Sequence, residues 1–391
     1  MPVLARYNDG TQRLVSPAET LERIAPHLAA NGVTRSMPVT RLDSLGVPTY
    51  CAIRPDGLLL QVSNGKGTSE VAARVSAVME AIELTHAERP VPSRLRRTSL
   101  AALAAAGEAV LAPGDIHGFR NTYFTPRFAC HWTAGENLVD GAHIWAPASA
   151  VYFFCAPCLH DTSTNGLASG NHLAEATLHA LYELIERDAM TRLSVNGVMR
   201  IRERAIVIDP ETIDDARVRG LVNQIESAGT KVSLLALPGA IPIHTFWAVT
   251  VNRHPLASVS TLNVGWGTHV DLGIAALRAL TEAAQSRLSL IHGAREDIPA
   301  KPVFQAEDTA GSAAVRYFLA LEPSAAWDDV HDMGTVPFHD DLEVLLDRVV
   351  AELARNGHDR LIRFDLTNPA LGDIPVVKVV APSLLFNHKL F

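Results

Sequence analysis

Hydrophobic and polar residues recur along this chain with two different periods, and the longest segments have the helical one. In residues 69–88 apolar side chains recur three and four positions apart, which predicts a helix that Ser69 can cap. Residues 172–194 and 271–291 show the same period and predict two more long helices. Shorter helices are expected at about 17–28, after a serine cap at Ser16, at 97–108, and at 342–355, before Asn356-Gly357.

Apolar runs typical of strands lie between these helices. Residues 49–62 surround Pro55-Asp56-Gly57 and predict two strands joined by a turn. Further strands are expected at 206–208, 232–237, 245–251, 361–366 and 376–380, and residues 111–160 contain short strand-like runs. Because helices and strands are interspersed, we predict an α/β (α+β) fold with mixed, largely antiparallel sheets.

The three long helices carry acidic or amide side chains three residues apart on one face. The pairs are Glu80 with Glu83, Glu183 with Glu186 (Glu175 lies on the same face), and Glu282 with Gln285. Burying five glutamates on apolar helices is costly unless positive charge compensates them. We favour a divalent metal with nucleotide phosphates, since Mg²⁺ prefers oxygen ligands. The alternative is solvated helix faces paired with Arg74, Arg89 or Arg187.

A glycine-bearing segment precedes each of these helices. Asn64–Gly67, Asn165–Asn171 and Gly265–Gly267 are expected to be turns, and their backbone N–H groups could approach phosphate. The sequence has no Walker A pattern, kinase glycine loop or dinucleotide fingerprint. Arg187 and Arg287 could clamp a phosphate or pair with the glutamates.

Composition narrows the range of partners. The chain has 391 residues, 48% of them hydrophobic, and a net charge of −8, which argues against nucleic acid as the main partner. No apolar run reaches the roughly 18 residues of a membrane span, and the N-terminus lacks a signal-peptide pattern. We expect a cytoplasmic protein without a membrane partner. Cys155-x-x-Cys158 could be half a zinc site or a redox pair, but buried structural thiols are favoured.

The acidic segments resemble the signatures of the YcaO family. The first is Gly65-Lys66-Gly67 with Ser76-Ala-Val-Met-Glu80-Ala-Ile-Glu83. The second joins Thr164-Asn165-Gly166-Leu-Ala-Ser-Gly-Asn171 to Glu175-Ala and to Ala180-Leu-Tyr-Glu183-Leu-Ile-Glu186-Arg187-Asp188. The third is Ala279-Leu-Thr-Glu282-Ala-Ala-Gln285-Ser-Arg287, and the resemblance runs from about residue 9 to residue 382.

Other motifs resemble the subgroup encoded beside TfuA proteins. They are Asp9-Gly10-Thr11-Gln-Arg13, Gly32-Val-Thr34-Arg35, Leu42-Asp43-Ser-Leu-Gly46-Val-Pro48 and Gly293-Ala-Arg295-Glu-Asp297. Ala381-Pro382-Ser383-Leu384 departs from the Pro-Gly-Leu-Glu of that subgroup.

The family resemblance implies an ATP- and Mg²⁺-dependent enzyme that phosphorylates a peptide backbone amide, with helices and sheets around an ATP-binding cleft. By motif position, Glu80, Glu83, Glu175 and Glu186 would hold Mg²⁺. Nucleotide contacts would come from Lys66, Ser76, Asn171, Glu183, Arg187, Arg287, Arg13 and Ser16, with Arg187, Arg287 and Glu183 as catalytic residues. Residues 1–61 would be an N-terminal lead-in region and 62–391 the catalytic domain. A homodimer is also implied.

Three functions of the protein remain open at this point. The favoured one is thioamide formation in a peptide or protein substrate, with a TfuA-like sulfur-delivery partner. An azoline-forming cyclodehydratase is the alternative, although Pro382 is the last proline and the proline-rich tail of such enzymes is not seen here. A non-catalytic accessory to ribosomal-protein methylthiolation is the third. In a purely structural alternative the acidic helices form a dimer seam, and added ATP would then not raise the melting temperature.

Overall fold

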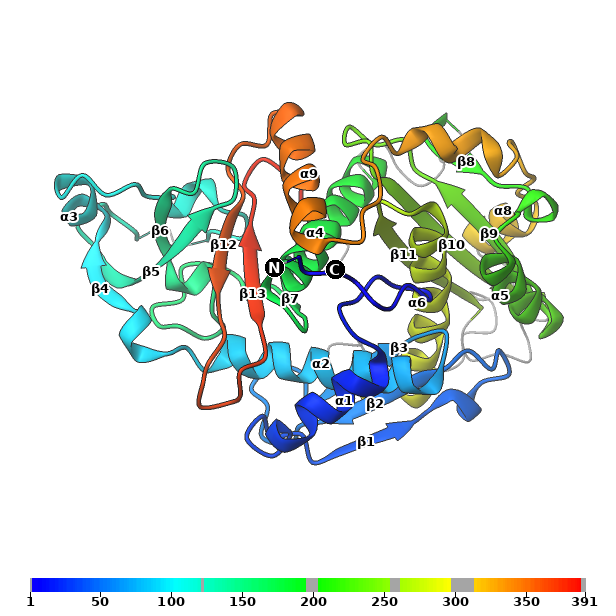
Figure 1. The fold of residues 1–391 in the computed structure, drawn as a ribbon, viewed down its shortest axis with the longest axis horizontal. Helices are drawn as coiled ribbons and strands as arrows, with labels where there is room; N and C mark the ends of the chain where they lie inside the picture. The colour runs from blue at the N-terminus through cyan, green and yellow to red at the C-terminus, as the bar shows by residue number, and fades with distance from the viewer. Residues whose placement is uncertain (1, 121–122, 195–202, 254–260, 297–312, 388–391) are drawn as a thin grey trace.

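The structure is a computed structural model that describes residues 2–120, 123–194, 203–253, 261–296 and 313–387. Its named strands form three antiparallel sheets, with long helices between them (Figure 1). The mixed, largely antiparallel α+β fold expected from the sequence is confirmed. Asp297 of the last TfuA-like motif and residues 388–391 lie outside the described part of the chain.

The first sheet has the order β1-β2-β3 and is covered by helix α2. Its strands are β1 (Arg35–Pro38), β2 (Thr49–Ile53) and β3 (Val62–Lys66), and α2 spans Glu70–Glu88. Helix α1 (Pro17–Ile24) also packs on α2 and starts at a capping box in which Ser16 and Glu19 satisfy each other's backbone N–H groups. The expected boundary at residue 61 falls inside this sheet, so the two proposed regions share it.

The second sheet has the order β11-β10-β9-β8 and packs against α6 (Leu272–His292) and α5 (Ala216–Ser227). Its strands are β8 (Ile206–Val207), β9 (Thr230–Ala236), β10 (His244–Asn252) and β11 (Leu262–His269). The side chain of Asp271 caps α6 by accepting a hydrogen bond from the backbone N–H of Ile274. Helix α8 (Ala313–Leu319) packs on β10.

The third sheet has six strands in the order β4-β5-β12-β13-β7, with β6 paired to β5. Its members are β4 (Arg96–Ser99), β5 (Ala129–Asn137), β6 (His143–Pro147), β7 (Leu167–Ser169), β12 (Ile362–Asp365) and β13 (Val376–Val380). Helix α4 (Leu173–Ser194) packs on β7 and β13, and α9 (Leu342–Arg355) packs on α4. The expected helix at 97–108 is shorter, because β4 occupies its start and α3 spans only Leu100–Ala105.

Two of the three predicted glycine turns are wrong, and the third is a turn only at Asn165 and Gly166, because Leu167–Ser169 form β7. Gly65 lies in β3, and Gly265 and Gly267 lie in β11. A Cβ atom on Gly65 would come within 2.0 Å of the Ala77 backbone nitrogen in α2. One on Gly265 would come within 2.1 Å of the Ala283 nitrogen in α6. These glycines therefore let a strand approach a helix closely, which is a packing role rather than a turn.

The burial of Cys155 and Cys158 also differs from expectation. Cys51 and Cys130 are buried, but Cys155 is half-buried and Cys158 is exposed. The prediction of buried structural thiols is therefore wrong for Cys158, because the Cys155–Cys158 segment runs at the surface. Within the described helices, none is both long and apolar enough to cross a bilayer.

Replacing Gly65 by alanine tests the close approach of β3 to α2. The added methyl group would overlap the backbone of α2, so we expect Gly65→Ala to lower the free energy of unfolding by about 2 kcal/mol or more. The control is Gly220→Ala in the exposed face of α5, where a Cβ meets nothing within 4 Å. Urea unfolding should show no loss for the control, and equal stability of both variants would refute the packing role.

Candidate active site

A cavity of about 640 Å³ lies where α2, α4, α6 and the N-terminal segment meet. Figure 1 shows these three helices around the middle of the molecule. Helices α2 and α6 line the cavity with residues at the same four-residue spacing. These residues are Ala72, Ser76 and Glu80 in α2, and Arg278, Glu282 and Ser286 in α6. Helix α4 contributes Glu175, His179, Glu183, Glu186 and Arg187. We call this cavity the central cleft.

The expected convergence of glutamates is present in the central cleft. Glu80 and Glu83 come from α2, and Glu175, Glu183 and Glu186 from α4, so helical spacing correctly places each set on one face. Glu282 of α6 joins them. The alternative, in which these acids pair with Arg74 or Arg89, is not what the structure has, since Arg74 donates to Ser36 Oγ and Arg89 to the Ala30 carbonyl.

Burial strongly raises the pKa of two of these carboxyl groups, those of Glu83 and Glu186. Burial raises the pKa of Glu83 to about 8, even though Ser169 donates to it from its N–H at 2.8 Å and its Oγ at 2.6 Å. Burial, followed by the charge of Glu282, raises the pKa of Glu186 to about 7. The Oε2 atom of Glu186 is buried and has no hydrogen-bond partner among the described residues. A buried, unpaired carboxylate oxygen is costly, so this position fits a metal ligand.

Glu175 has a different environment. Its Oε1 accepts from Arg13 Nη1 at 3.3 Å and from the Asn171 N–H at 3.2 Å, and its Oε2 accepts from the Leu14 N–H at 2.8 Å. Its side chain is buried. In this structure Glu175 therefore anchors the N-terminal segment to α4, while still lining the central cleft.

Cationic side chains line the same cleft. Lys66 forms an ion pair with Glu282. Burial acts to raise the pKa of Glu282, but the positive charges of Lys66 and Arg187 outweigh burial and lower this pKa. The Nε atom of Arg187 lies 3.9 Å from Oε1 of Glu183. Burial raises the pKa of Glu183, and the positive charge of Arg187 opposes this rise. Arg295 lies 4.0 Å from Glu80. The cleft is therefore a mixed site, in which carboxylates can hold a metal ion and cations can hold phosphates.

Two of the expected nucleotide contacts are placed elsewhere. Arg287 is 5% exposed, does not line the central cleft, and pairs with Asp43 at 2.8 Å. It lies five residues after Glu282, which turns it towards another face of α6. Ser16 caps α1 and is not among the lining residues either. The other expected contacts, Lys66, Ser76, Asn171, Glu183, Arg187 and Arg13, all line the cleft.

Arg278 and His179 are among the polar residues of the cleft that the sequence interpretation missed. Arg278 Nη1 donates to His179 Nε2 at 3.0 Å. Burial, with the nearby charges of Arg13 and Arg278, holds the pKa of His179 well below its usual range. Spacing could have revealed both, because His179 lies four residues from Glu175 and from Glu183, and Arg278 lies four residues before Glu282.

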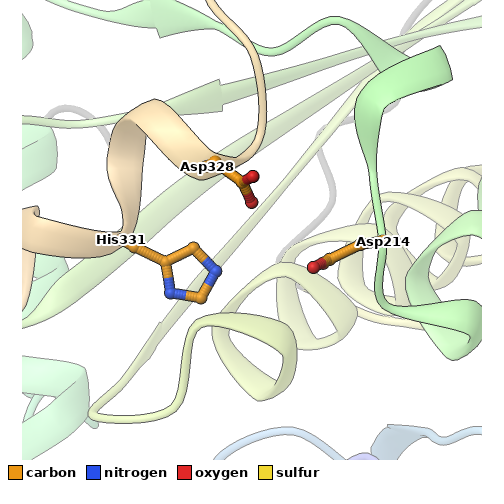
Figure 2. Close-up of side chains that lie close together, drawn as sticks. All are labelled: Asp214, Asp328 and His331. Carbon is orange, nitrogen blue, oxygen red and sulfur yellow. The ribbon is translucent and has the colours of Figure 1, made fainter.

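A second group of potential ligands lies outside the cleft. It consists of Asp214, from the segment before α5, and Asp328 and His331, from a short 3₁₀ helix (Figure 2). The potential ligand atoms of the three residues lie within 4.8 Å of one another. All three side chains are exposed, and nothing beyond their proximity points to a bound ion. We assign this group no function.

Sequence comparison identifies one family. The family model described as YcaO cyclodehydratase, binding ATP and Mg²⁺, matches residues 64–385. An uncharacterised protein of Methanothermobacter thermautotrophicus is 34% identical over 387 residues, which cover 95% of this chain and 94% of that protein. A Rhizobium leguminosarum protein described only by its place in the tfuA 3′ region is 32% identical, over 97% of this chain and 90% of that protein.

Solved structures agree with this result. YcaO from Methanopyrus kandleri, bound with AMPPCP and Mg²⁺, is similar with a TM-score of 0.76 and 26% identity, over 98% of this chain and 95% of that one. A heterocyclase in complex with substrate and cofactor has a TM-score of 0.79 at 21% identity, over 99% of this chain and 54% of that one, and shows the shared fold. From the family match and the full-length relatives we conclude that this chain belongs to the YcaO family.

Proposed function

We propose that the protein uses ATP and Mg²⁺ to phosphorylate a peptide backbone amide, and that the product is a thioamide. The observation that carries this proposal is the convergence of glutamates from α2, α4 and α6 on one cleft, two of them (Glu175 and Glu186) buried, together with the unpaired Glu186 Oε2. Family membership supports ATP as the cosubstrate and Mg²⁺ as the metal ion that bind in this cleft.

The residues present fit Mg²⁺ with a nucleotide. A cavity of about 640 Å³ falls within the range typical of small-molecule sites. Glu80, Glu83, Glu175 and Glu186 offer the carboxylate oxygens that Mg²⁺ prefers. Glu83 is already oriented by its two hydrogen bonds from Ser169, so its carboxylate needs little reorganisation to act as a ligand.

The basic residues have the complementary role. Arg13, Lys66, Arg187 and Arg278 line the cleft next to the glutamates, where they can hold and orient phosphate oxygens. ATP, when bound, supplies the phosphoryl group that converts the amide oxygen into a leaving group. Positioning and charge neutralisation dominate phosphoryl transfer, so the protein needs no nucleophile of its own.

Sulfur as the incoming nucleophile is the finer part of the proposal. It is supported by the TfuA-like motifs at Asp9–Arg13 and Leu42–Pro48, and by the position of the Rhizobium relative beside tfuA. A TfuA-like partner would deliver the sulfur to a peptide or protein substrate. Homodimerisation stays a prediction, which light scattering can check.

Mass spectrometry tests the product. The protein would be incubated with ATP, Mg²⁺, sulfide, a TfuA-like protein and candidate peptides encoded near its gene. Exchange of oxygen for sulfur adds about 16 Da, as we expect, whereas loss of about 18 Da would mean cyclodehydration, both by reaction stoichiometry. ATP consumption without any change in peptide mass would reject both activities.

Glu186→Gln tests the carboxylate cluster directly. We expect this variant to lose Mg²⁺-dependent ATP turnover at least about 100-fold, because the uncharged amide cannot replace the carboxylate ligand. The control is Glu352→Gln in α9, which removes an equally buried glutamate outside the cleft. Phosphate release would be measured for both, and a fully active Glu186→Gln variant would contradict the assignment.

The raised pKa of Glu83 predicts how stability depends on pH. In metal-free protein the unfolded state loses this proton near pH 4.5, whereas the folded state keeps it up to about pH 8. The free energy of unfolding should therefore fall as pH rises between these values. Thermal melts in chelator at pH 5 and pH 8 should show a smaller fall for Glu83→Gln. Mg²⁺ should also reduce the fall, because it stabilises the ionised form, and a pH slope unaffected by both would contradict the proposal.

A further inference from the structure

A lysine is buried beneath the central cleft. Lys378 lies in the middle of β13, between β12 and β7, and is 4% exposed. The flanking residues of β13 are buried valines. A charged side chain in such an apolar strand has a desolvation cost that an apolar residue would avoid.

The contacts of this lysine leave its charge largely uncompensated. Its Nζ donates to the carbonyl oxygen of Ser163 at 2.6 Å, and it has no ion pair within 4.0 Å in the described part of the chain. Burial lowers the pKa of Lys378 to about 8, and the charge of Glu183 is what opposes this shift. The ammonium therefore remains mostly protonated at neutral pH, close enough to Glu183 to affect it.

The hydrogen bond of Lys378 also holds one wall of the cleft. Ser163 begins a turn in which the Leu167 N–H donates to the Thr164 carbonyl at 2.7 Å. The Val379 N–H, from the residue after Lys378, donates to the Gly166 carbonyl at 2.8 Å. Thr164 lines the cleft, and the turn leads into β7, where Ser169 holds Glu83.

Glu183 is the group that connects this lysine to the cleft. The charged groups that act on it are Arg187 from its own helix, Lys378 from β13, and Glu282 and Arg278 from α6. Burial is the main cause of the raised pKa of Glu83 on α2, and the charge of Glu183 adds to it. Lys378 and Arg187 are the two largest favourable influences on the charged form of Glu183, and only Arg187 lines the cleft.

We propose that Lys378 is a positioning residue of the nucleotide site, whose hydrogen bond to the Ser163 carbonyl fixes the Ser163–Gly166 turn at the wall of the cleft and whose buried positive charge acts on Glu183 from outside the cleft lining. This inference rests on the proposed function, because it treats Glu183 as part of the nucleotide site. It predicts that the lysine is retained for binding at some cost to stability.

Stability and binding should therefore respond in opposite ways to one substitution. Methionine has nearly the length of lysine and no charge, so Lys378→Met should fold with an unchanged or higher melting temperature. Its dissociation constant for a non-hydrolysable ATP analogue with Mg²⁺ should rise about tenfold or more. Lys378→Arg keeps the charge and should bind within about threefold of wild type, by the same electrostatic argument.

The control is Lys231→Met in β9. Lys231 also donates its Nζ to backbone carbonyls, those of Leu319 and Leu321, and burial also lowers its pKa, but it does not line or underlie the cleft. Calorimetric titration and thermal melts would be run on wild type and the three variants. Lys231→Met should bind the nucleotide as wild type does.

The possible outcomes separate this inference from the proposed function. If wild type does not bind the Mg²⁺–nucleotide, the proposed function fails and the inference fails with it. If wild type binds and Lys378→Met binds equally well, only the inference fails. A lower melting temperature together with weaker binding in Lys378→Met would show a merely structural role. Loss of binding in Lys378→Arg as well would show that charge is not what the site requires.

Discussion

The mutual repulsion and desolvation of carboxylates around one cleft is the constraint that organises this structure. Glu83 and Glu186 are held where burial raises their pKa, and Glu186 keeps an oxygen without a partner. A fold selected for stability alone would place apolar residues here. The arrangement is therefore best understood as a site in which a divalent cation supplies the missing positive charge.

The sheets make this convergence possible. Gly65 in β3 and Gly265 in β11 let each strand lie close to its helix, α2 or α6, and both helices line the cleft together with α4. The two strand–helix pairs present lining residues with the same spacing but different chemistry, acidic in α2 and mixed in α6. The cleft consequently has carboxylates for a metal ion and cations for phosphates within one cavity.

Much of this arrangement was predictable from the sequence, because helical period and i,i+3 spacing depend only on local geometry. The three long helices and the shared face of Glu175, Glu183 and Glu186 follow from it. The glycines were misjudged, since a turn and a close strand–helix contact both favour glycine and only tertiary packing separates them. The roles of Arg287 and Lys378 could not be predicted from residue spacing. They depend on Asp43 and Glu183, respectively, which lie far away in the chain.

The most direct test of the central claim is a crystal structure of the protein with Mg²⁺ and a non-hydrolysable ATP analogue. The account predicts that the triphosphate lies in the central cleft, with Mg²⁺ bound by glutamates of both α2 and α4, and with Glu186 Oε2 among the ligands. A nucleotide bound elsewhere, or a cleft in which these glutamates pair only with Lys66, Arg187 and Arg295, would contradict it.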